Sequence, residues 1–245
     1  TELKKTGTKE GCSEGGCGAC TIVLGELVDN KIEYKAINSC ISFVPSLNGK
    51  QLIIVEDLVS ENGKLHPVQD AMVKFHGSQC GFCTPGFVMS LFSMFKNNKS
   101  LNNELITDSI SGNLCRCTGY RPIIDAAKSL NKINKNDQFS KNKNKVIQQL
   151  KKIKPKNVYI KKDDKIYFSP KNIKDLKNII KKHSNFSFLA GGTDLSLKVT
   201  KERKEIPFII DLKEINELDF IKVSKNYLEV GSATPLIKFE KEIKK

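Results

Sequence analysis

The sequence predicts an α+β protein built in successive parts, and three changes of pattern along the chain support this prediction. Residues 1–57 combine a glycine-rich loop with short alternating apolar runs, which is typical of strands and turns. Residues 58–131 carry apolar side chains three to four positions apart, as amphipathic helices do. After a lysine-rich stretch over 132–157, residues 158–245 mix both patterns. We therefore expect three folded parts and one linker.

The first part is expected to contain a loop and three strands. The loop covers residues 7–20 and is rich in glycine. The run 21–24 predicts a strand, and Asp29-Asn30 predicts a turn into a second strand over 32–37. The run 51–55 predicts the third strand.

The second part is expected to be helical. Apolar side chains recur with helical spacing over 68–75, 87–95 and 123–130. Thr84 is the candidate N-cap of the middle helix, and Pro122 opens the last helix where proline is favoured. The sequence thus places two helix starts shortly after cysteine pairs.

The linker and the third part complete the expected organisation. Residues 132–157 are dominated by Lys and Asn with few apolar residues, so we expect an exposed linker with at most one short helix. The third part is expected to contain a helix over 173–180, buried strands over 186–190 and 208–212, and a hairpin over 220–230.

The charge of the chain is strongly positive, with a formal net charge of +14. Only Arg116, Arg121 and Arg203 among the 41 basic residues are arginine, and the chain lacks tryptophan. Phosphate and base recognition favour Arg and stacking aromatic side chains, so we expect no nucleic-acid partner. No apolar run approaches the roughly 18 residues of a membrane span. Since no signal peptide is visible either, we expect a cytoplasmic protein without a membrane partner.

All eight cysteines lie between Cys12 and Cys117. In a chain without a secretion signal, such clustering indicates metal binding rather than disulfide bonds. The histidines, His66, His76 and His183, show no paired spacing, so we expect structural or surface roles for them. His66 precedes a proline and is expected at the start of a helix.

The first cysteine set has the spacing of plant-type ferredoxins. Cys12, Cys17 and Cys20 are separated by four and two residues, and Cys40 follows later. Glycines between them let backbone N–H groups approach an anionic cluster closely. This spacing favours a [2Fe–2S] cluster, whereas structural zinc, the alternative, usually takes cysteines from two short knuckles. We expect all four residues to be ligands.

The second cysteine set consists of two close pairs, Cys80 with Cys83 and Cys115 with Cys117. Each pair lies just before an expected helix, where unpaired backbone N–H groups and the helix dipole stabilise negative charge. Two helix starts directed at one point predict a small helical bundle with a second [2Fe–2S] cluster. Zinc remains the alternative here as well.

The stretches around these cysteines resemble the molybdenum hydroxylase family. The resemblance is carried by residues 6–21, 65–69, 76–92 and 112–122. Within the family, the chain is most similar to the iron–sulfur and flavin subunit of bacterial xanthine dehydrogenases. In that branch the molybdenum centre belongs to a separate chain.

The resemblance implies three domains. They are a plant-type ferredoxin-like β-grasp [2Fe–2S] domain over 1–57, a four-helix-bundle [2Fe–2S] domain over 58–131, and the N-terminal part of an α+β FAD-binding domain over 158–245. The chain begins with Thr1 rather than Met and ends in an amphipathic segment. We therefore expect the first and last of these domains to be truncated.

The resemblance also implies an electron-transfer function. A molybdopterin-binding large subunit, in a heterodimer or a dimer of heterodimers, would oxidise hypoxanthine and xanthine in purine catabolism. Electrons would pass through the second cluster, then the first, to FAD and on to NAD. No catalytic residue is expected in this chain. Gln79 and Cys117 are similar to residues that face the molybdopterin of the partner.

A flavin site is implied in the third part. The expected strand ends at Gly191-Gly192 before a helix, which alone is a weak sign of phosphate binding, and a G-x-G-x-x-G motif is absent. The resemblance makes this turn a pyrophosphate loop and places a second loop near the flavin. The residues implied for FAD are Leu189, Ala190, Gly191, Gly192, Thr193, Asp194, Leu195, Gly231, Ala233 and Thr234.

Other functions remain open from the sequence. The same electron-transfer role could serve an aldehyde or another substrate of the molybdenum hydroxylases. A zinc-binding interaction module is the alternative from a different class. Colour separates the two, because an iron–sulfur protein is red-brown and a zinc protein is colourless.

Overall fold

The computed structural model describes residues 4–153 and 156–244. The chain divides into two compact units. The first is Thr1–Ser42 with Leu47–Ile153, and the second is Phe43–Ser46 with Lys154–Lys245. Each unit combines helices with a sheet, which confirms the α+β class. The described residues include no helix of sufficient length and apolar character to cross a membrane.

A three-stranded antiparallel sheet in the order β2-β1-β3 lies in the first unit. Its strands are β1 (Thr21–Val28), β2 (Lys31–Asn38) and β3 (Gln51–Ile53). Asp29 and Asn30 link β1 to β2 with φ values of 46° and 61°. Asp and Asn tolerate this left-handed conformation, which suits a tight hairpin turn. All three strands expected from the sequence are confirmed.

In the described part of the first unit, six α-helices follow in the sequence. They are α1 (Pro67–Lys74), α2 (Thr84–Asn97), α3 (Asn103–Ile110), α4 (Arg121–Ser129), α5 (Gln138–Lys141) and α6 (Lys143–Lys152). The sequence predicted α1, α2 and α4. It missed α3, an eight-residue helix that begins at an N-cap, Asn102, whose side chain accepts a hydrogen bond from the backbone of Leu105.

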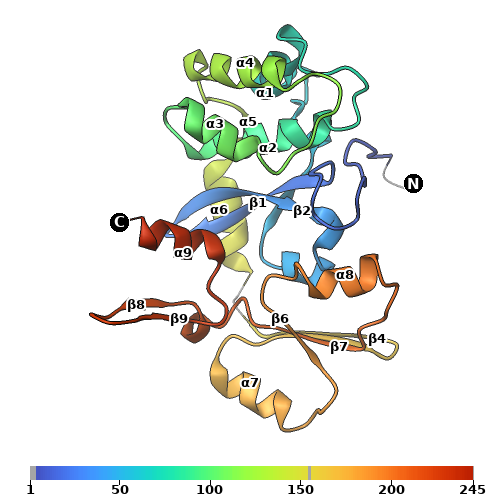
Figure 1. Ribbon diagram of the computed structural model, residues 1–245, viewed down its shortest axis with the longest axis vertical. Helices are drawn as coiled ribbons and strands as arrows, with labels where there is room; N and C mark the ends of the chain where they lie inside the picture. The colour runs from blue at the N-terminus through green and yellow to red at the C-terminus, as the bar shows by residue number, and fades with distance from the viewer. Residues whose placement is uncertain (1–3, 154–155, 245) are drawn as a thin grey trace. The chain divides into compact units, whose positions relative to one another are not determined.

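Helix α2 forms the centre of the core of the first unit. Its residues 86–95 are all buried, and it packs against α1, α3, β1 and β2. Tyr34 of β2 meets Phe92 of α2 edge-on, with 5.6 Å between the ring centroids. Figure 1 shows α2 next to the sheet, with α1, α3 and α4 beyond it and α6 beside the sheet. One continuous core therefore joins the strand-rich and helical parts.

The structure corrects the expectation of an exposed linker over 132–157, because residues 137–152 contain the helices α5 and α6. Phe139 is only 9% exposed, and its ring lies 4.8 Å from that of Phe92. Leu150 of α6 is buried as well. A few apolar side chains thus fix a lysine-rich segment to the core, although its composition resembles that of a linker.

The second unit contains a four-stranded sheet in the order β4-β5-β7-β6. Its strands are β4 (Val158–Lys162), β5 (Lys165–Ser169), β6 (Ser187–Leu189) and β7 (Phe208–Asp211). The pairs β5–β7 and β6–β7 are parallel, and β4 adds to the edge as an antiparallel strand. The sequence did not predict β4 and β5, because burial in these strands does not alternate: β4 has no buried residue, and residues 167–169 of β5 are all buried.

Helices α7 (Ile173–Ile180) and α8 (Leu195–Thr200) pack on this sheet. Side chains of α7 join one cluster with Phe208 and Ile210, whereas Leu195 joins another with Tyr167 and Ile209. Alternate residues of β7 thus face opposite sides, as the period of a strand requires. The unit ends with the hairpin β8 (Ile221–Val223) and β9 (Leu228–Val230) and with helix α9 (Leu236–Ile243).

Candidate metal and cofactor sites

The β1–β2 hairpin brings the first cysteine set together. Cys20 directly precedes β1, and Cys40 follows β2, whose last residue, Asn38, pairs with Thr21. The two Sγ atoms lie 3.2 Å apart. In the loop before β1, the backbone N–H of Cys17 donates to the Sγ of Cys12 at 3.4 Å. The four thiols therefore form two pairs, Cys12 with Cys17 and Cys20 with Cys40.

The environment of this set favours negative charge on sulfur. Desolvation raises the pKa of Cys12, but hydrogen bonds from the backbone of Glu14 and Cys17 outweigh it and lower that pKa to about 7. In Cys40, desolvation and the hydrogen bond with Cys20 raise the pKa to about 12. Two adjacent thiols cannot both ionise without a positive centre nearby. This donor set therefore fits a metal cluster between the pairs.

The second cysteine set lies at the starts of two helices. Cys83 is the N-cap of α2, and Cys115 and Cys117 lie in the loop before α4. Side-chain hydrogen bonds connect Cys80 with Cys117 and Cys83 with Cys115, so the expected ligands meet across the loops. Cys80 and Cys117 are exposed, whereas the other two are partly buried.

The predicted N-cap of α2 differs by one residue from the observed one. Thr84 is the first residue of the helix, and its Oγ1 donates to the Oγ of Ser78 at 2.7 Å. The cap is Cys83, whose side chain caps no backbone N–H. Its sulfur is instead directed to the cysteine set. At the other helix start, α4 begins at Arg121, with Pro122 in its first turn.

The thiols of the second set show opposite pKa shifts within each pair. A backbone N–H of Phe82 lowers the pKa of Cys80, while the hydrogen bond with Cys80 raises that of Cys117. Desolvation and the bond with Cys115 raise the pKa of Cys83 to about 12. For Cys115, desolvation opposes the ionised form, but hydrogen bonds from Thr118 lower the pKa.

Thr118 and Tyr120 hold the Cys115 loop in place, and the sequence analysis did not single them out. Thr118 Oγ1 lies 3.1 Å from the Sγ of Cys115, and its backbone N–H donates to the same sulfur at 3.5 Å. The hydroxyl of Tyr120 accepts the backbone N–H of Cys115 at 2.9 Å. Tyr120 has a left-handed φ of 66°, which is costly for a bulky residue. Their position within the C-x-C-T-G-Y segment was the available signal.

The residues present fit a [2Fe–2S] cluster in each set. Among the residues that the structure describes, no three His, Cys, Asp or Glu side chains converge as they would on a single ion. The eight thiols instead lie in pairs, and a cluster with two irons and four cysteine ligands takes two thiolates on each iron. When bound, such clusters act as carriers of single electrons.

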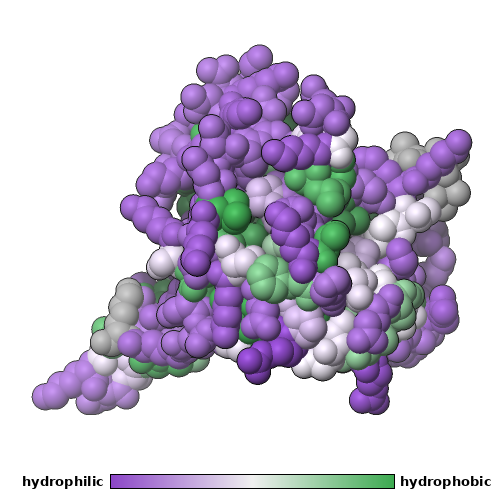
Figure 2. Space-filling model, turned by 90° about the horizontal axis from the view of Figure 1, so that it is seen from above, coloured by the Kyte–Doolittle hydropathy of each residue, from purple (hydrophilic) through white to green (hydrophobic). Residues whose placement is uncertain are grey.

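Gln79 and Cys117, which the resemblance directs toward the partner, are both exposed. Phe82 and Leu114 lie beside the same cysteines and expose 47% and 57% of their surface. Figure 2 shows a largely hydrophilic face broken by hydrophobic areas. The second set thus reaches the surface beside apolar side chains.

The glycine loop expected to bind FAD lies between β6 and α8. Gly191 and Gly192 have φ values of 153° and 92°, and a Cβ added at Gly191 would meet nothing within 4 Å. The backbone N–H of Ser196 donates to the carbonyl of Gly192 at 2.9 Å, which fixes the turn into α8. Ala190, Thr193 and Asp194 are exposed. The open space over this loop fits close approach of a phosphate group.

The second loop implied for FAD makes its hydrogen bonds with other residues of the second unit. Gly231 and Ala233 are buried, and their backbone N–H groups donate to carbonyls of Phe220 and Leu218. A Cβ at Gly231 would lie 2.2 Å from the carbonyl oxygen of Leu218. Thr234 Oγ1 also donates to Phe220. Close packing in the second unit therefore accounts for the glycine in this loop.

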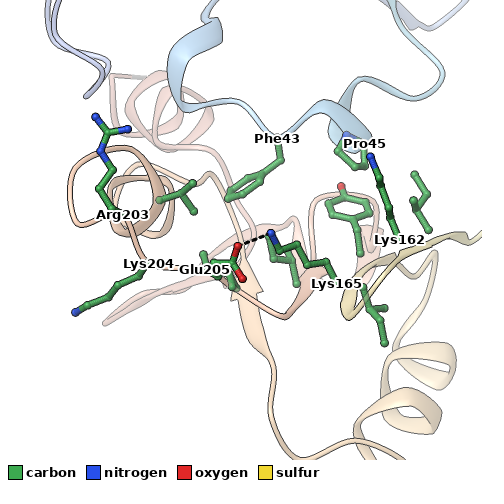
Figure 3. Close-up of a pocket in the computed structure, with 13 residues that line it drawn as sticks. Phe43, Pro45, Lys162, Lys165, Arg203, Lys204 and Glu205 are labelled. Atoms are coloured by element: carbon green, nitrogen blue, oxygen red, sulfur yellow. Dashed lines mark hydrogen bonds and ion pairs between the residues drawn. The ribbon is translucent and has the colours of Figure 1, made fainter.

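A pocket of about 460 Å³ lies in the second unit, on the sheet face that carries Tyr167 and Ile209. Figure 3 shows the ring of Phe43 directed into it and the side chain of Lys165 directed toward Glu205, with which it forms an ion pair of 2.7 Å. The described residues that line it include none of those implied for FAD. This pocket is therefore separate from the glycine loop.

Two family models match the chain. The "[2Fe-2S] binding domain" matches residues 54–128, which contain the second cysteine set. The "FAD binding domain in molybdopterin dehydrogenase" matches residues 159–245, which contain both implied flavin loops. Fold and site together define an iron–sulfur and FAD-binding electron-transfer protein.

Curated proteins with similar sequences indicate the family of this electron-transfer protein. Xanthine dehydrogenase from Blastobotrys adeninivorans is 55% identical over 125 residues, which are 50% of this chain and 9% of that protein. Aldehyde oxidase 1 from Oryctolagus cuniculus is 48% identical over 130 residues, which are 52% of this chain and 10% of that protein. The chain belongs to the molybdenum hydroxylase family, as its iron–sulfur and flavin part. It spans about a tenth of the length of these curated relatives.

Quinoline 2-oxidoreductase from Pseudomonas putida 86 is 32% identical, and the match covers 61% of this chain and 78% of that one, with a TM-score of 0.46.

Proposed function

We propose that this chain is the electron-transfer subunit of a xanthine dehydrogenase. It would carry electrons from a molybdopterin centre in a partner subunit through two [2Fe–2S] clusters to FAD and on to NAD. The observation that carries the proposal is the arrangement of eight thiols as four pairs within one folded unit. Cys12, Cys17, Cys20 and Cys40 would hold one cluster, and Cys80, Cys83, Cys115 and Cys117 the other.

The exposure of the two cysteine sets supports this direction of electron flow. Cys80 and Cys117 are exposed, while Cys20 is 2% exposed. A partner that covers the second set would bring its molybdopterin near Gln79 and Cys117. Phe82 and Leu114 supply apolar surface for such a contact, as interface cores require.

The expected domains are part of the same proposal. A ferredoxin-like domain over 1–57 and a helical bundle over 58–131 would each hold one cluster, and residues 158–245 would form the start of the FAD-binding domain. Shared core packing supports a fixed spacing of the first two, since Tyr34 and Phe92 lie in one cluster of buried side chains.

The second candidate is the same electron-transfer role in an aldehyde oxidase. Its support is an identity to aldehyde oxidase 1 close to that for xanthine dehydrogenase. The oxidised substrate would bind in the partner rather than here. The holoenzyme assayed with xanthine and with an aldehyde, with NAD as acceptor, separates the two. Faster formation of NADH with xanthine supports the first proposal, and oxidation of the aldehyde alone contradicts it.

The flavin loop is tested by Gly191→Val in the holoenzyme. Valine would fill the open space where phosphate oxygens are expected, so FAD content should fall while both clusters are retained. Reduction of the clusters by substrate should persist, and delivery of electrons to NAD should decrease. Gly63→Val is the matched control, because Gly63 also has a positive φ of 78° and open space around it. Unchanged FAD content in Gly191→Val would show that the loop is only a turn.

A further inference from the structure

The two cysteine loops meet at a buried asparagine. Asn113 is 3% exposed and lies two residues before Cys115. Its Nδ2 donates to the carbonyl of Gly18 at 3.0 Å and to Thr21 Oγ1 at 3.1 Å. Its Oδ1 accepts the hydroxyl of Ser90, on α2, at 2.6 Å. One side chain thus joins three segments, each of which carries or adjoins expected cluster ligands.

The backbones at this point are in direct contact. A Cβ added to Gly86 of α2 would lie 2.2 Å from the carbonyl oxygen of Gly18, and one added to Gly18 would lie 2.3 Å from that of Gly112. Gly18 also has a left-handed φ of 71°. The backbone N–H of Leu114 donates to the carbonyl of Cys17 at 2.9 Å. No side chain other than hydrogen fits at Gly18 or Gly86 without moving one loop from the other.

We propose that Asn113, with Gly18 and Gly86, forms a clamp that sets the distance and orientation between the two clusters. These three are positioning residues, because none of them is an expected ligand. The clamp is buried and satisfies the carbonyl of Gly18, the hydroxyl of Thr21 and the amide of Asn113, so it holds one geometry. This inference rests on the proposed function, since it assumes that both cysteine sets hold clusters.

The magnetic interaction between the two clusters reports the distance and orientation that the clamp is proposed to set. When both [2Fe–2S] clusters are reduced, each is paramagnetic, and the splitting of their electron-paramagnetic signals depends on their separation and orientation. A general loss of stability changes the amount of folded protein but not this splitting. The measurement is made on the reduced holoenzyme, together with iron and sulfide analysis.

Gly86→Ala is the most selective variant. Alanine is intrinsically a better helix former than glycine, so the change favours α2 while its Cβ pushes Gly18 away. We expect both individual signals to remain and the splitting to be lost or markedly reduced. Gly112→Ala is the matched control, because its Cβ meets nothing within 4 Å, and it should keep the splitting. A splitting in Gly86→Ala equal to that of the control would overturn the proposal.

A second pair of variants tests the hydrogen bonds. Asn113→Asp keeps the shape and accepts from Ser90, but it cannot donate to Gly18 or Thr21. We expect the same loss of splitting. Asn97→Asp is the control, because Asn97 also joins α2 to the sheet, by donating to the carbonyl of Tyr34 at 2.6 Å and accepting its N–H at 3.0 Å.

The outcomes of this experiment separate the two proposals. Equal splitting in Asn113→Asp and Asn97→Asp would contradict the clamp. Loss confined to Asn113→Asp and Gly86→Ala would support it. A wild-type holoenzyme without two cluster signals would instead overturn the proposed function, and the clamp with it.

Discussion

Thr118 is the side chain that most directly adjusts a single expected ligand. Its hydroxyl lies 3.1 Å from the Sγ of Cys115 and its backbone N–H donates to the same atom. A thiolate that holds a cluster has no proton, so the hydroxyl must donate. Hydrogen bonds to cluster sulfurs stabilise the reduced, more negative state and raise the reduction potential.

Thr118→Val is therefore expected to lower the potential of the second cluster. One hydrogen bond of about 1 kcal/mol corresponds to roughly 40 mV for a one-electron couple. A redox titration followed by paramagnetic resonance measures both clusters in one sample, and the first cluster should not shift. Thr107→Val is the control, because the hydroxyl of Thr107 donates to a helix carbonyl of Asn103. An unchanged second potential would show that the Thr118 hydroxyl does not donate to the ligand.

Asp137 forms a buried ionic contact away from the cysteines. Its carboxylate accepts from Nε2 of His66 at 2.9 Å and from Nζ of Lys96 at 2.7 Å, and all three side chains are nearly buried. Desolvation opposes its ionisation, but the hydrogen bonds from His66 and Lys96 outweigh it and lower the pKa of Asp137 below the ordinary 3.8. Removing one partner of such a contact leaves an uncompensated buried charge.

Asp137→Asn is expected to reduce the free energy of unfolding by about 3 kcal/mol at pH 7. Because the folded pKa is depressed, the contribution of the carboxylate is present above its unfolded value and is lost as the pH falls toward the folded value. The difference between wild type and variant should thus shrink as the pH decreases below 3.8. Urea unfolding at several pH values measures it. A difference that grows in acid would contradict this assignment.

At the scale of elements, α5 and α6 show that the segment expected to be a linker packs on the core of the first unit. Phe139 lies against Phe92, and its ring is also 6.5 Å from that of Tyr34 and 6.2 Å from that of His66. These contacts belong to the same core that supports the cysteine loops. The segment is therefore part of the first unit over 137–152.

Phe139→Ala is expected to destabilise the protein by about 3–5 kcal/mol, because it removes a buried aromatic ring and leaves a cavity. Denaturant unfolding of the first unit measures the effect. Ile133→Ala, at a residue that is 41% exposed, should change stability by less than about 0.5 kcal/mol. Similar, small effects of both changes would mean that the segment is an exposed linker after all.

The elements that the sequence predicted are those with a strong apolar period. Apolar side chains at helical spacing predicted α2, although its residues 86–95 are all buried. An apolar run predicted β1, and alternation predicted β2. Strand β4 could not be predicted from periodicity, since none of its residues is buried. For α6, the lysine-rich composition allowed only one short helix inside an expected linker, and Leu150 is its one buried residue. Helix α3 was missed because it is short and polar, with buried residues only at Ile106 and Ile110.

At the scale of the whole molecule, the two cysteine sets differ in their access to solvent. Cys80 and Cys117 are exposed, whereas Cys20 is buried and Cys12, Cys17 and Cys40 are partly buried. The sequence identified all eight expected ligands from their spacing. It could not identify Asn113, because its role depends on which loops meet in three dimensions. Thr118 contacts Cys115 within one loop, so the signal for it was local.

In the chain alone, the second cluster is expected to lose iron to a chelator before the first, because water and chelator reach its exposed sulfurs. Each cluster's paramagnetic signal, followed against time after addition of the chelator, measures the two losses separately. Binding of the proposed partner subunit should slow the loss from the second cluster only. Earlier loss from the first cluster would contradict the exposures described above.

The most direct test of the central claim is the metal content of the natively purified protein combined with single ligand variants. The account predicts about four irons and four labile sulfides per chain, from two [2Fe–2S] clusters with four thiolates each. Cys17→Ser should abolish the paramagnetic signal of the first cluster, and Cys83→Ser that of the second. In each variant the signal of the other cluster should be retained. Stoichiometric zinc without sulfide, in a colourless protein, would contradict the account.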